Sequence, residues 1–164
     1  MIRVAVLTIS DSVVAGTRED RSGAKLRDRA QALGWTAQAS EVVPDEADQI
    51  AAVLRRWADS GQVSVILTTG GTGVAARDVT PEATGGIIDR AIPGLAELMR
   101  LEGLKTTPFA ALSRGLAGVR GRCLIVNLPG SPKGAVESLD AIAKLVPHVV
   151  DLLEGRTSHN DVPH

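Results

Sequence analysis

Residues 63–73 read VSVILTTGGTG, a short β-branched run that leads directly into a cluster of glycines and threonines. Such a run is typical of a buried strand, and the glycines mark the turn that follows it. Similar short apolar runs alternate along the chain with longer amphipathic ones. This alternation predicts βαβ units in a three-layer α/β/α fold, with a mostly parallel sheet between two layers of helices.

Local signals place further elements before and after this strand in the sequence. Strands are expected at residues 3–10, 36–43, 63–68 and 123–128, with a further candidate at 112–119. Helices are expected to open at Ser22, after Asp45 as N-cap, after Thr80 as cap with Pro81 as first residue, and over residues 95–102 and 132–146. Pro147 kinks or restarts the last helix. We expect one domain over residues 1–155 and a frayed tail over 156–164.

Composition and charge narrow the possible functions. The 164 residues suffice for one domain with its own core. Lys and Arg number 18 against 19 Asp and Glu, a net charge of −1, so no basic field attracts nucleic acid or an anionic membrane. The aromatic residues are Trp35, Trp57 and Phe109, too few for a base-stacking platform. A small polar substrate fits this composition better.

Targeting signals and several catalytic motifs are missing from the sequence. No apolar run approaches the roughly 18 residues of a membrane span, and Asp11 follows the N-terminal apolar run too soon for a signal peptide, so we expect a cytoplasmic protein. Cys123 lies in an apolar run and is interpreted as a small buried hydrophobe. No P-loop, Ser/His/Asp set or His/Cys metal cluster is recognisable. A relaxed dinucleotide pattern at residues 71–76 is discounted, because Pro81 indicates that the next helix begins later.

Polar or glycine-rich segments follow four of the expected strands, at the edge where ligands bind in open parallel sheets. These segments are residues 10–12, 44–46, 68–73 and 127–134. The glycines at 70–73 could cradle an anion with their N–H groups, or could form a tight turn only. At the last segment Ser131, Pro132 and Lys133 could bind an anion at a helix N-terminus, or simply cap that helix.

Asp45 and Asp78 are the candidate metal ligands. Phosphoryl or nucleotidyl transfer needs Mg²⁺ held by one or two carboxylates together with substrate oxygens. Asp45 could instead serve only as an N-cap, and Asp78 could be a turn aspartate that bonds its own backbone. Asp11 is ambiguous in the same way.

Taken together, these segments resemble a known family, the molybdopterin adenylyltransferases of molybdenum cofactor biosynthesis, which share a fold with the G domain of gephyrin and of its plant counterpart. The resemblance runs through nearly the whole chain, in residues 7–12, 22–23, 43–46, 68–73, 77–83, 107–108, 112–114 and 127–133. It implies a homotrimer that transfers AMP from Mg·ATP to the terminal phosphate of molybdopterin and releases pyrophosphate. It also implies hand-over of the product to the molybdenum-inserting protein, with no tightly bound cofactor.

The resemblance also assigns site residues by position. Asp45 and Asp78 match the aspartates that the family requires for function and are the predicted catalytic residues. The predicted phosphate-, nucleotide- and pterin-binding residues are Ser10, Asp11, Ser12, Thr69, Gly70, Gly71, Thr72, Gly73, Arg77, Ser113, Asn127, Pro129, Gly130, Ser131 and Lys133. In the predicted reaction the glycine loop neutralises phosphate charge and Lys133 or Arg77 assists.

Two other functions remain open at this point. A paralogous bacterial group keeps the fold and the TGGTG segment without activity, so the alternative is a non-catalytic molybdopterin-binding or scaffold protein. The intact segments 44–46 and 77–80 favour the enzyme. A dinucleotide oxidoreductase is the third reading, and a failure to bind NAD(P) would dismiss it.

Overall fold

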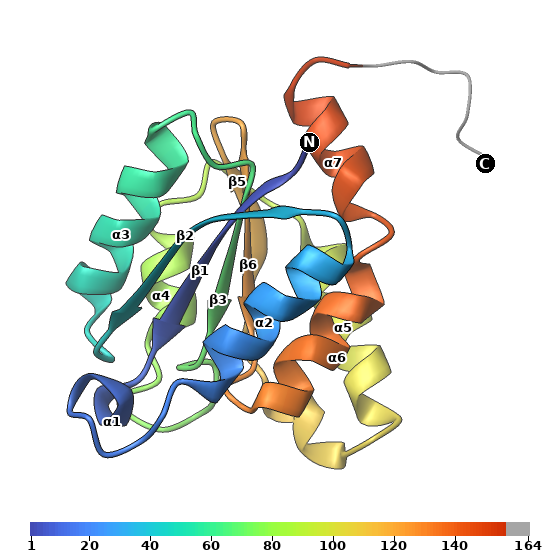
Figure 1. Ribbon diagram of the computed structural model, residues 1–164. Coiled ribbons are helices and arrows are strands. Elements are labelled where there is room, and N and C mark those ends of the chain that lie inside the picture. The colour runs from blue at the N-terminus through green and yellow to red at the C-terminus, as the bar shows by residue number, and fades with distance from the viewer. Residues whose placement is uncertain (157–164) are drawn as a thin grey trace.

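The computed structural model describes residues 1–156, and its centre is a sheet of six strands in the order β2-β1-β3-β6-β5-β4 (Figure 1). The strands are β1 Arg3–Ile9, β2 Thr36–Val43, β3 Val65–Thr69, β4 Arg90–Ala91, β5 Ala117–Arg120 and β6 Cys123–Leu128. β1, β2, β3 and β6 run parallel, whereas β5 pairs antiparallel with both β6 and β4. The predicted mostly parallel sheet is confirmed.

Helices cover both faces of this sheet and complete the predicted three layers (Figure 1). They are α1 Asp11–Val14, α2 Arg21–Ala32, α3 Ala47–Asp59, α4 Thr80–Gly85, α5 Pro93–Leu104, the 3-10 turn η1 Pro108–Leu112, α6 Pro132–Ile142 and α7 Val146–Leu153. α3 and α4 pack on one face, and α2, α5, α6 and α7 on the other. No helix among residues 1–156 is long and apolar enough to cross a membrane.

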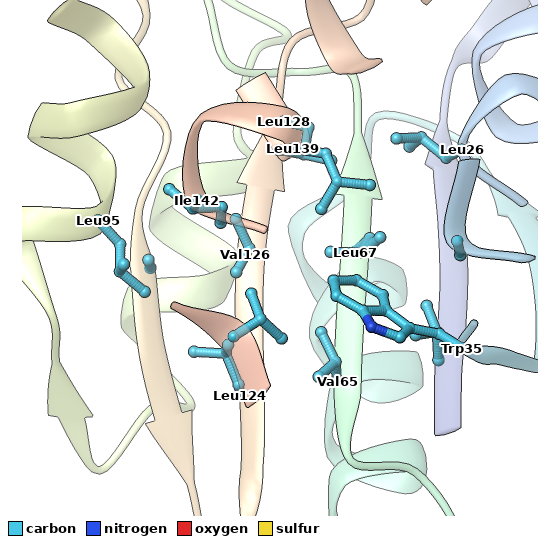
Figure 2. Close-up of a cluster of buried hydrophobic side chains, with 14 of the residues drawn as sticks. Leu26, Trp35, Val65, Leu67, Leu95, Leu124, Val126, Leu128, Leu139 and Ile142 are labelled. Atoms are coloured by element: carbon cyan, nitrogen blue, oxygen red, sulfur yellow. The ribbon is translucent and has the colours of Figure 1, made fainter. Parts of the chain in front are cut away.

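Alternating side chains of the strands divide the core into two clusters. Val4 and Val6 of β1 face the layer of α2, α5, α6 and α7, while Ala5 and Leu7 face α3 and α4. Figure 2 shows the first cluster, in which the side chains of Leu26, Trp35, Leu67, Leu139 and Ile142 are buried between sheet and helices. Burial on both faces explains the continuous apolar runs of the parallel strands. This burial also holds the parallel strands, and therefore their carboxyl ends, in fixed positions.

Several element boundaries differ from the sequence prediction. The candidate strand at 112–119 is β5, which begins only at Ala117, because Leu112 closes the 3-10 turn η1. α2 begins at Arg21 instead of Ser22, since the Asp20 side chain caps it by accepting the Gly23 N–H at 2.9 Å. Thr80 is the first residue of α4 and Val79 its cap, one residue earlier than predicted. The two-residue strand β4 had no sequence signal.

The C-terminal end agrees only partly with prediction. Pro147 restarts a helix, because α6 ends at Ile142 and α7 begins at Val146. Arg156, the first residue of the predicted frayed tail, forms ion pairs with Asp151 and Glu154. The rest of that predicted tail, residues 157–164, lies outside the described residues.

Candidate functional site

A cleft lies at the carboxyl ends of the parallel strands. β1 and β2 point toward this edge of the sheet, where α1 also lies (Figure 1). It has two adjoining cavities of about 520 and 770 Å³. We call the first the apolar lobe, because Ala96, Met99, Phe109 and Leu112 line it. The second is the polar lobe, lined by polar side chains that include Ser10, Thr17, Arg18, Asp20, Asp45 and Thr69. The lobes meet at a junction formed by Gly71, Asp78, Gly130 and Ser131, which line both.

The glycine loop after β3 needs its glycines for steric reasons. Gly70 and Gly71 have φ of +103° and +67°, values that favour glycine. A Cβ at Gly70 would lie 2.2 Å from the Ile9 carbonyl oxygen, and one at Gly71 would lie 2.3 Å from Thr80 Oγ1. Thr80, at the start of α4, closes the loop: its Oγ1 donates to the Gly70 carbonyl at 2.9 Å and its N–H to the Gly71 carbonyl at 3.1 Å.

The same loop lines the cleft and contains backbone donors that no acceptor within residues 1–156 uses. The Gly70 N–H is already used, since it donates to the Leu128 carbonyl at 3.2 Å. By contrast, the N–H groups of Gly71, Thr72 and Gly73 donate to no acceptor within residues 1–156. Free N–H groups of successive residues in such a loop are the donors that an anion cradle requires. The predicted cradle is therefore available at positions 71–73 and not at 70.

The segment after β6 packs directly against the glycine loop. A Cβ at Gly130 would lie 3.4 Å from the Gly70 Cα. Thr69 Oγ1 donates to the Pro129 carbonyl at 2.7 Å and Ser22 Oγ to the Gly130 carbonyl at 2.5 Å, so hydroxyls from β3 and α2 hold this segment. Ser131 caps α6 by accepting the Gly134 N–H at 3.1 Å, as predicted. The positive end of the α6 dipole thus lies at the junction.

Asp45 is held by a reciprocal clip with Asp11. The Asp11 N–H donates to Asp45 Oδ2 and the Asp45 N–H donates to Asp11 Oδ1, each at 3.0 Å. Arg77 backs this clip, because its Nε and Nη2 donate to the Asp11 carboxylate at 2.6 and 3.0 Å, and its Nη2 also donates to Glu46 at 3.0 Å. The proposed N-cap role of Asp45 is wrong: Glu46 occupies the cap of α3, without a side-chain bond to the helix.

The clip gives its two carboxyl groups opposite pKa shifts. Burial raises the pKa of Asp45 above 3.8, and the charges of Asp11 and Asp78 add to that rise against the opposing Asp11 N–H bond. The Arg77 hydrogen bonds and the Asp45 N–H lower the pKa of Asp11. A positively charged ligand in the polar lobe would therefore relieve the cost of ionising Asp45.

Asp78 is a turn aspartate, one of the two roles considered from sequence, and its metal-ligand role stays a prediction. Its Oδ2 accepts the Ala75 N–H at 3.0 Å and its own N–H donates to the Ala75 carbonyl at 3.0 Å, which is the turn geometry. It also lines both lobes of the cleft. The turn therefore holds the Asp78 carboxylate at the junction.

The structure brings most of the predicted binding residues to the cleft. Those that line it are Ser10, Thr69, Gly70, Gly71, Thr72, Gly73, Ser113, Asn127, Pro129, Gly130 and Ser131. The amide of Asn127 is already satisfied, because it donates to Thr68 and Thr84 hydroxyls and accepts the Leu116 N–H. Its side chain therefore stabilises the wall of the apolar lobe through these hydrogen bonds.

Four predicted residues line neither lobe: Asp11, Ser12, Arg77 and Lys133. Ser12 Oγ lies 3.1 Å from Ser10 Oγ, and Lys133 lies on the surface of α6 near Glu137. The structure adds Arg114, which lies in the family segment 112–114 and for which no role was predicted. It bonds the Gly73 and Asp78 carbonyls, and only the resemblance of residues 112–114 pointed toward it.

The donor set for a metal is small. Within residues 1–156 no group of three or more His, Cys, Asp and Glu side chains could hold a metal ion. Two carboxylates with further oxygens from a phosphate ligand suit Mg²⁺, which keeps several waters and rarely has an all-protein cage. Cys123 is buried in β6, and burial raises the pKa of its thiol to about 12, so it is not a nucleophile.

The architecture is that of α/β proteins that bind a small molecule at the carboxyl edge of a parallel sheet, here between a glycine loop and a helix N-terminus. The family model described as "Probable molybdopterin binding domain" matches residues 5–148. The chain belongs to this family of molybdopterin-binding domains.

Named relatives are similar over almost the whole chain. The molybdopterin adenylyltransferase of Helicobacter pylori is 42% identical over 156 residues, with 94% of this chain and 89% of the relative covered. The Drosophila melanogaster molybdenum cofactor synthesis protein cinnamon is 47% identical over 93% of this chain, which spans only 26% of cinnamon. The structure of the molybdopterin biosynthesis enzyme MoaB of Thermus thermophilus has a TM-score of 0.89 at 55% identity, over 94% of this chain and 98% of that one.

Proposed function

We propose that this chain is a molybdopterin adenylyltransferase, which transfers AMP from Mg·ATP to the terminal phosphate of molybdopterin and releases pyrophosphate. The observation that carries the proposal is the junction, where Asp78 and Gly71, whose N–H is free, lie between two lobes of different polarity. A reaction between two phosphorylated ring compounds needs two neighbouring subsites that share one phosphate-binding centre. Membership of the family and the similarity to named adenylyltransferases support the same activity.

The residues of the chain divide the work of this reaction by chemistry. Phosphate oxygens would accept hydrogen bonds from the N–H groups at 71–73 and lie near the N-terminus of α6. Asp45 and Asp78 would hold Mg²⁺, which neutralises charge on the triphosphate when bound. Arg77 is engaged by Asp11 and Glu46, and Lys133 lies near Glu137, so backbone donors carry most of the phosphate binding.

A single-turnover assay tests the proposal. Purified protein is mixed with molybdopterin, Mg²⁺ and α-labelled ATP, and adenylyl-molybdopterin and pyrophosphate are followed. The Asp78→Asn variant should retain pterin binding and lose turnover, because the amide cannot supply the negative charge of a Mg²⁺ ligand. Asp28→Asn is the matched control, since Asp28 is exposed on α2 and outside both lobes.

Each outcome distinguishes between the candidate functions. Product from wild type and Asp28→Asn, but not from Asp78→Asn, supports the transferase. Pterin binding without product from wild type favours the non-catalytic molybdopterin-binding alternative. A wild-type rate in Asp78→Asn contradicts the metal-ligand role of that aspartate.

The wider biochemical setting is proposed on the resemblance. We expect a homotrimer, hand-over of the product to a molybdenum-inserting protein, and, because ATP is the donor, action in the cytoplasm. Light scattering should give three times the chain mass of 17.1 kDa. A monomer at micromolar concentration would contradict the trimer.

A further inference from the structure

A single residue outside the lining of the cleft holds the loop that carries Asp78. Residues 72–79 form the later part of the connection between β3 and α4 and have no regular secondary structure. Arg114 bonds three of their carbonyls: its N–H donates to Thr72 at 2.8 Å, its Nε to Gly73 at 2.7 Å and its Nη2 to Asp78 at 2.7 Å. Among residues 1–156, no other side chain donates to a carbonyl of this loop.

The contacts of Arg114 depend on the shape of its guanidinium. Two of its nitrogens reach carbonyls that are five residues apart in sequence, Gly73 and Asp78, and so draw the two ends of the turn together. Its Nη1 pairs with Glu82 on α4, which supplies the compensating charge and whose pKa is lowered by this contact. A lysine ammonium has its donors on one nitrogen and cannot reproduce this planar, divergent arrangement.

The backbone around Arg114 is itself fixed from the apolar lobe. Arg100 of α5, which lines that lobe, donates from Nη1 to the Ser113 carbonyl at 3.3 Å and to the Gly115 carbonyl at 3.1 Å. These carbonyls flank Arg114 on both sides. The wall of the apolar lobe, Arg114 and the Asp78 turn therefore form one continuous set of hydrogen bonds.

We propose that Arg114 is a positioning residue that sets the Asp78 carboxylate and the glycine loop relative to the wall of the apolar lobe. The inference deepens the proposed function, because it matters for turnover only if Asp78 acts at the junction. Misplacing a reacting centre by about 1 Å can lower a rate by about 10²-fold, so a loosened loop should affect kcat more than substrate binding.

The test compares Arg114→Lys with Arg120→Lys. Arg120 is a matched arginine remote from the cleft lining, since it pairs with Asp59 and donates to the Ile87 carbonyl at 2.8 Å. Steady-state kinetics should show kcat about 10- to 100-fold lower in Arg114→Lys, with KM for ATP changed less than about threefold. Arg120→Lys should lower the melting temperature while leaving kcat within about twofold of wild type.

A second readout does not depend on activity. The Ala75 and Asp78 amides are hydrogen-bonded within the turn, so amide hydrogen exchange reports whether the turn is closed. Their protection should fall by at least about tenfold in Arg114→Lys and stay unchanged in Arg120→Lys. Unchanged kcat in Arg114→Lys, or wild-type protection of both amides, would overturn the proposal.

Wild-type protein keeps the proposal testable if Arg114→Lys does not fold. Its Ala75 and Asp78 amides should exchange more slowly than those of Val74 and Arg77, which have no acceptor within residues 1–156. Equal exchange of all four would overturn the inference. Wild type that makes no adenylyl-molybdopterin would refute the proposed function, while the exchange data would still judge the role of Arg114 in holding the turn.

Discussion

The two lobes of the cleft are built in opposite ways. In the polar lobe, backbone hydrogen bonds hold the acidic side chains: Asp45 accepts the Asp11 N–H, and Asp20 accepts the Gly23 N–H. In the apolar lobe, Val74 and Phe109 remain 71% and 74% exposed. The polar lobe is therefore organised before a ligand arrives, whereas the apolar lobe gains much of its burial from the ligand. Changes in the polar lobe should act on kcat, and changes in the apolar lobe on KM.

The strongest test of this contrast is Asp45→Asn. We expect kcat to fall by about 10²–10³-fold, because a charge that stabilises the phosphate-transfer centre is lost. The amide oxygen can still accept the Asp11 N–H, so the free energy of unfolding at pH 7 should not fall. Rapid-quench kinetics and urea unfolding measure the two effects, with Asp28→Asn alongside. Wild-type activity in Asp45→Asn would show that the Asp45 carboxylate takes no part in the reaction.

The next test separates backbone strain from crowding in the glycine loop. A Cβ at Gly71 would meet Thr80 Oγ1 at 2.3 Å and Asp45 Oδ1 at 3.2 Å. Gly71→Ala should therefore lower the free energy of unfolding by about 1–3 kcal/mol and kcat by about tenfold.

Gly121→Ala is the control for Gly71→Ala, because Gly121 also has positive φ, +57°, but a Cβ there meets nothing within 4 Å. It should lose stability through strain alone and keep wild-type kcat. Equal activity loss in both variants would show that the loop is not organised around Thr80 and Asp45.

A smaller effect is expected in the apolar lobe. Phe109→Ala removes a ring that can pack on a planar substrate. Such packing contributes about 0.5–1.5 kcal/mol to binding, so KM for one substrate should rise roughly two- to tenfold. Stability should hardly change, because the ring is largely exposed. Leu101→Ala, exposed on α5 and outside both lobes, is the control. A loss of kcat with unchanged KM would contradict the division of labour between the lobes.

The smallest effect concerns pH and stability. Because burial raises the pKa of Asp45, the folded state favours its neutral form. Its contribution to stability is complete below the unfolded pKa of 3.8, and it declines as pH rises from there through the folded pKa. Asp11 has the opposite sign, since its lowered pKa gives stability above 3.8 that is lost as pH falls.

Urea unfolding between pH 3 and 7 checks these signs. As pH rises, the free energy of unfolding of wild type should fall relative to that of Asp45→Asn. It should rise relative to that of Asp11→Asn. The activity of wild type should instead increase through the Asp45 pKa, because the ionised carboxylate binds the cation. A stability difference from Asp45→Asn that does not vary with pH would contradict the raised pKa of Asp45.

Signals that lie within a few residues predicted most of the fold. The buried parallel strands and the Ser131 cap followed from apolar runs and from capping chemistry, both of which are local. The antiparallel pairing of β4 and β5 was missed, because β4 has only two residues and strand direction is decided by distant partners. Asp45 was misread as a cap because its true partner, Asp11, is 34 residues away.

The candidate site was predictable to the extent that side-chain chemistry marks it. Glycines at 70–73 and carboxylates at 45 and 78 are recognisable types, and the structure places them together around the cleft. The role of Arg114 was not recognisable, since its acceptors are backbone carbonyls, which every residue has. Asn127 was expected to face a substrate, but sequence could not reveal that buried threonines already satisfy its amide.

The junction of the two lobes has a consequence for inhibitor design and product release. A molecule with two ring systems joined through a diphosphate bridge can fill both lobes while losing translational freedom only once, so linkage alone can raise its affinity well above that of either half. The adenylylated product has this form. It should be retained more tightly than each substrate, which would make its departure the slow step and favour direct transfer to the next protein over diffusion through solution.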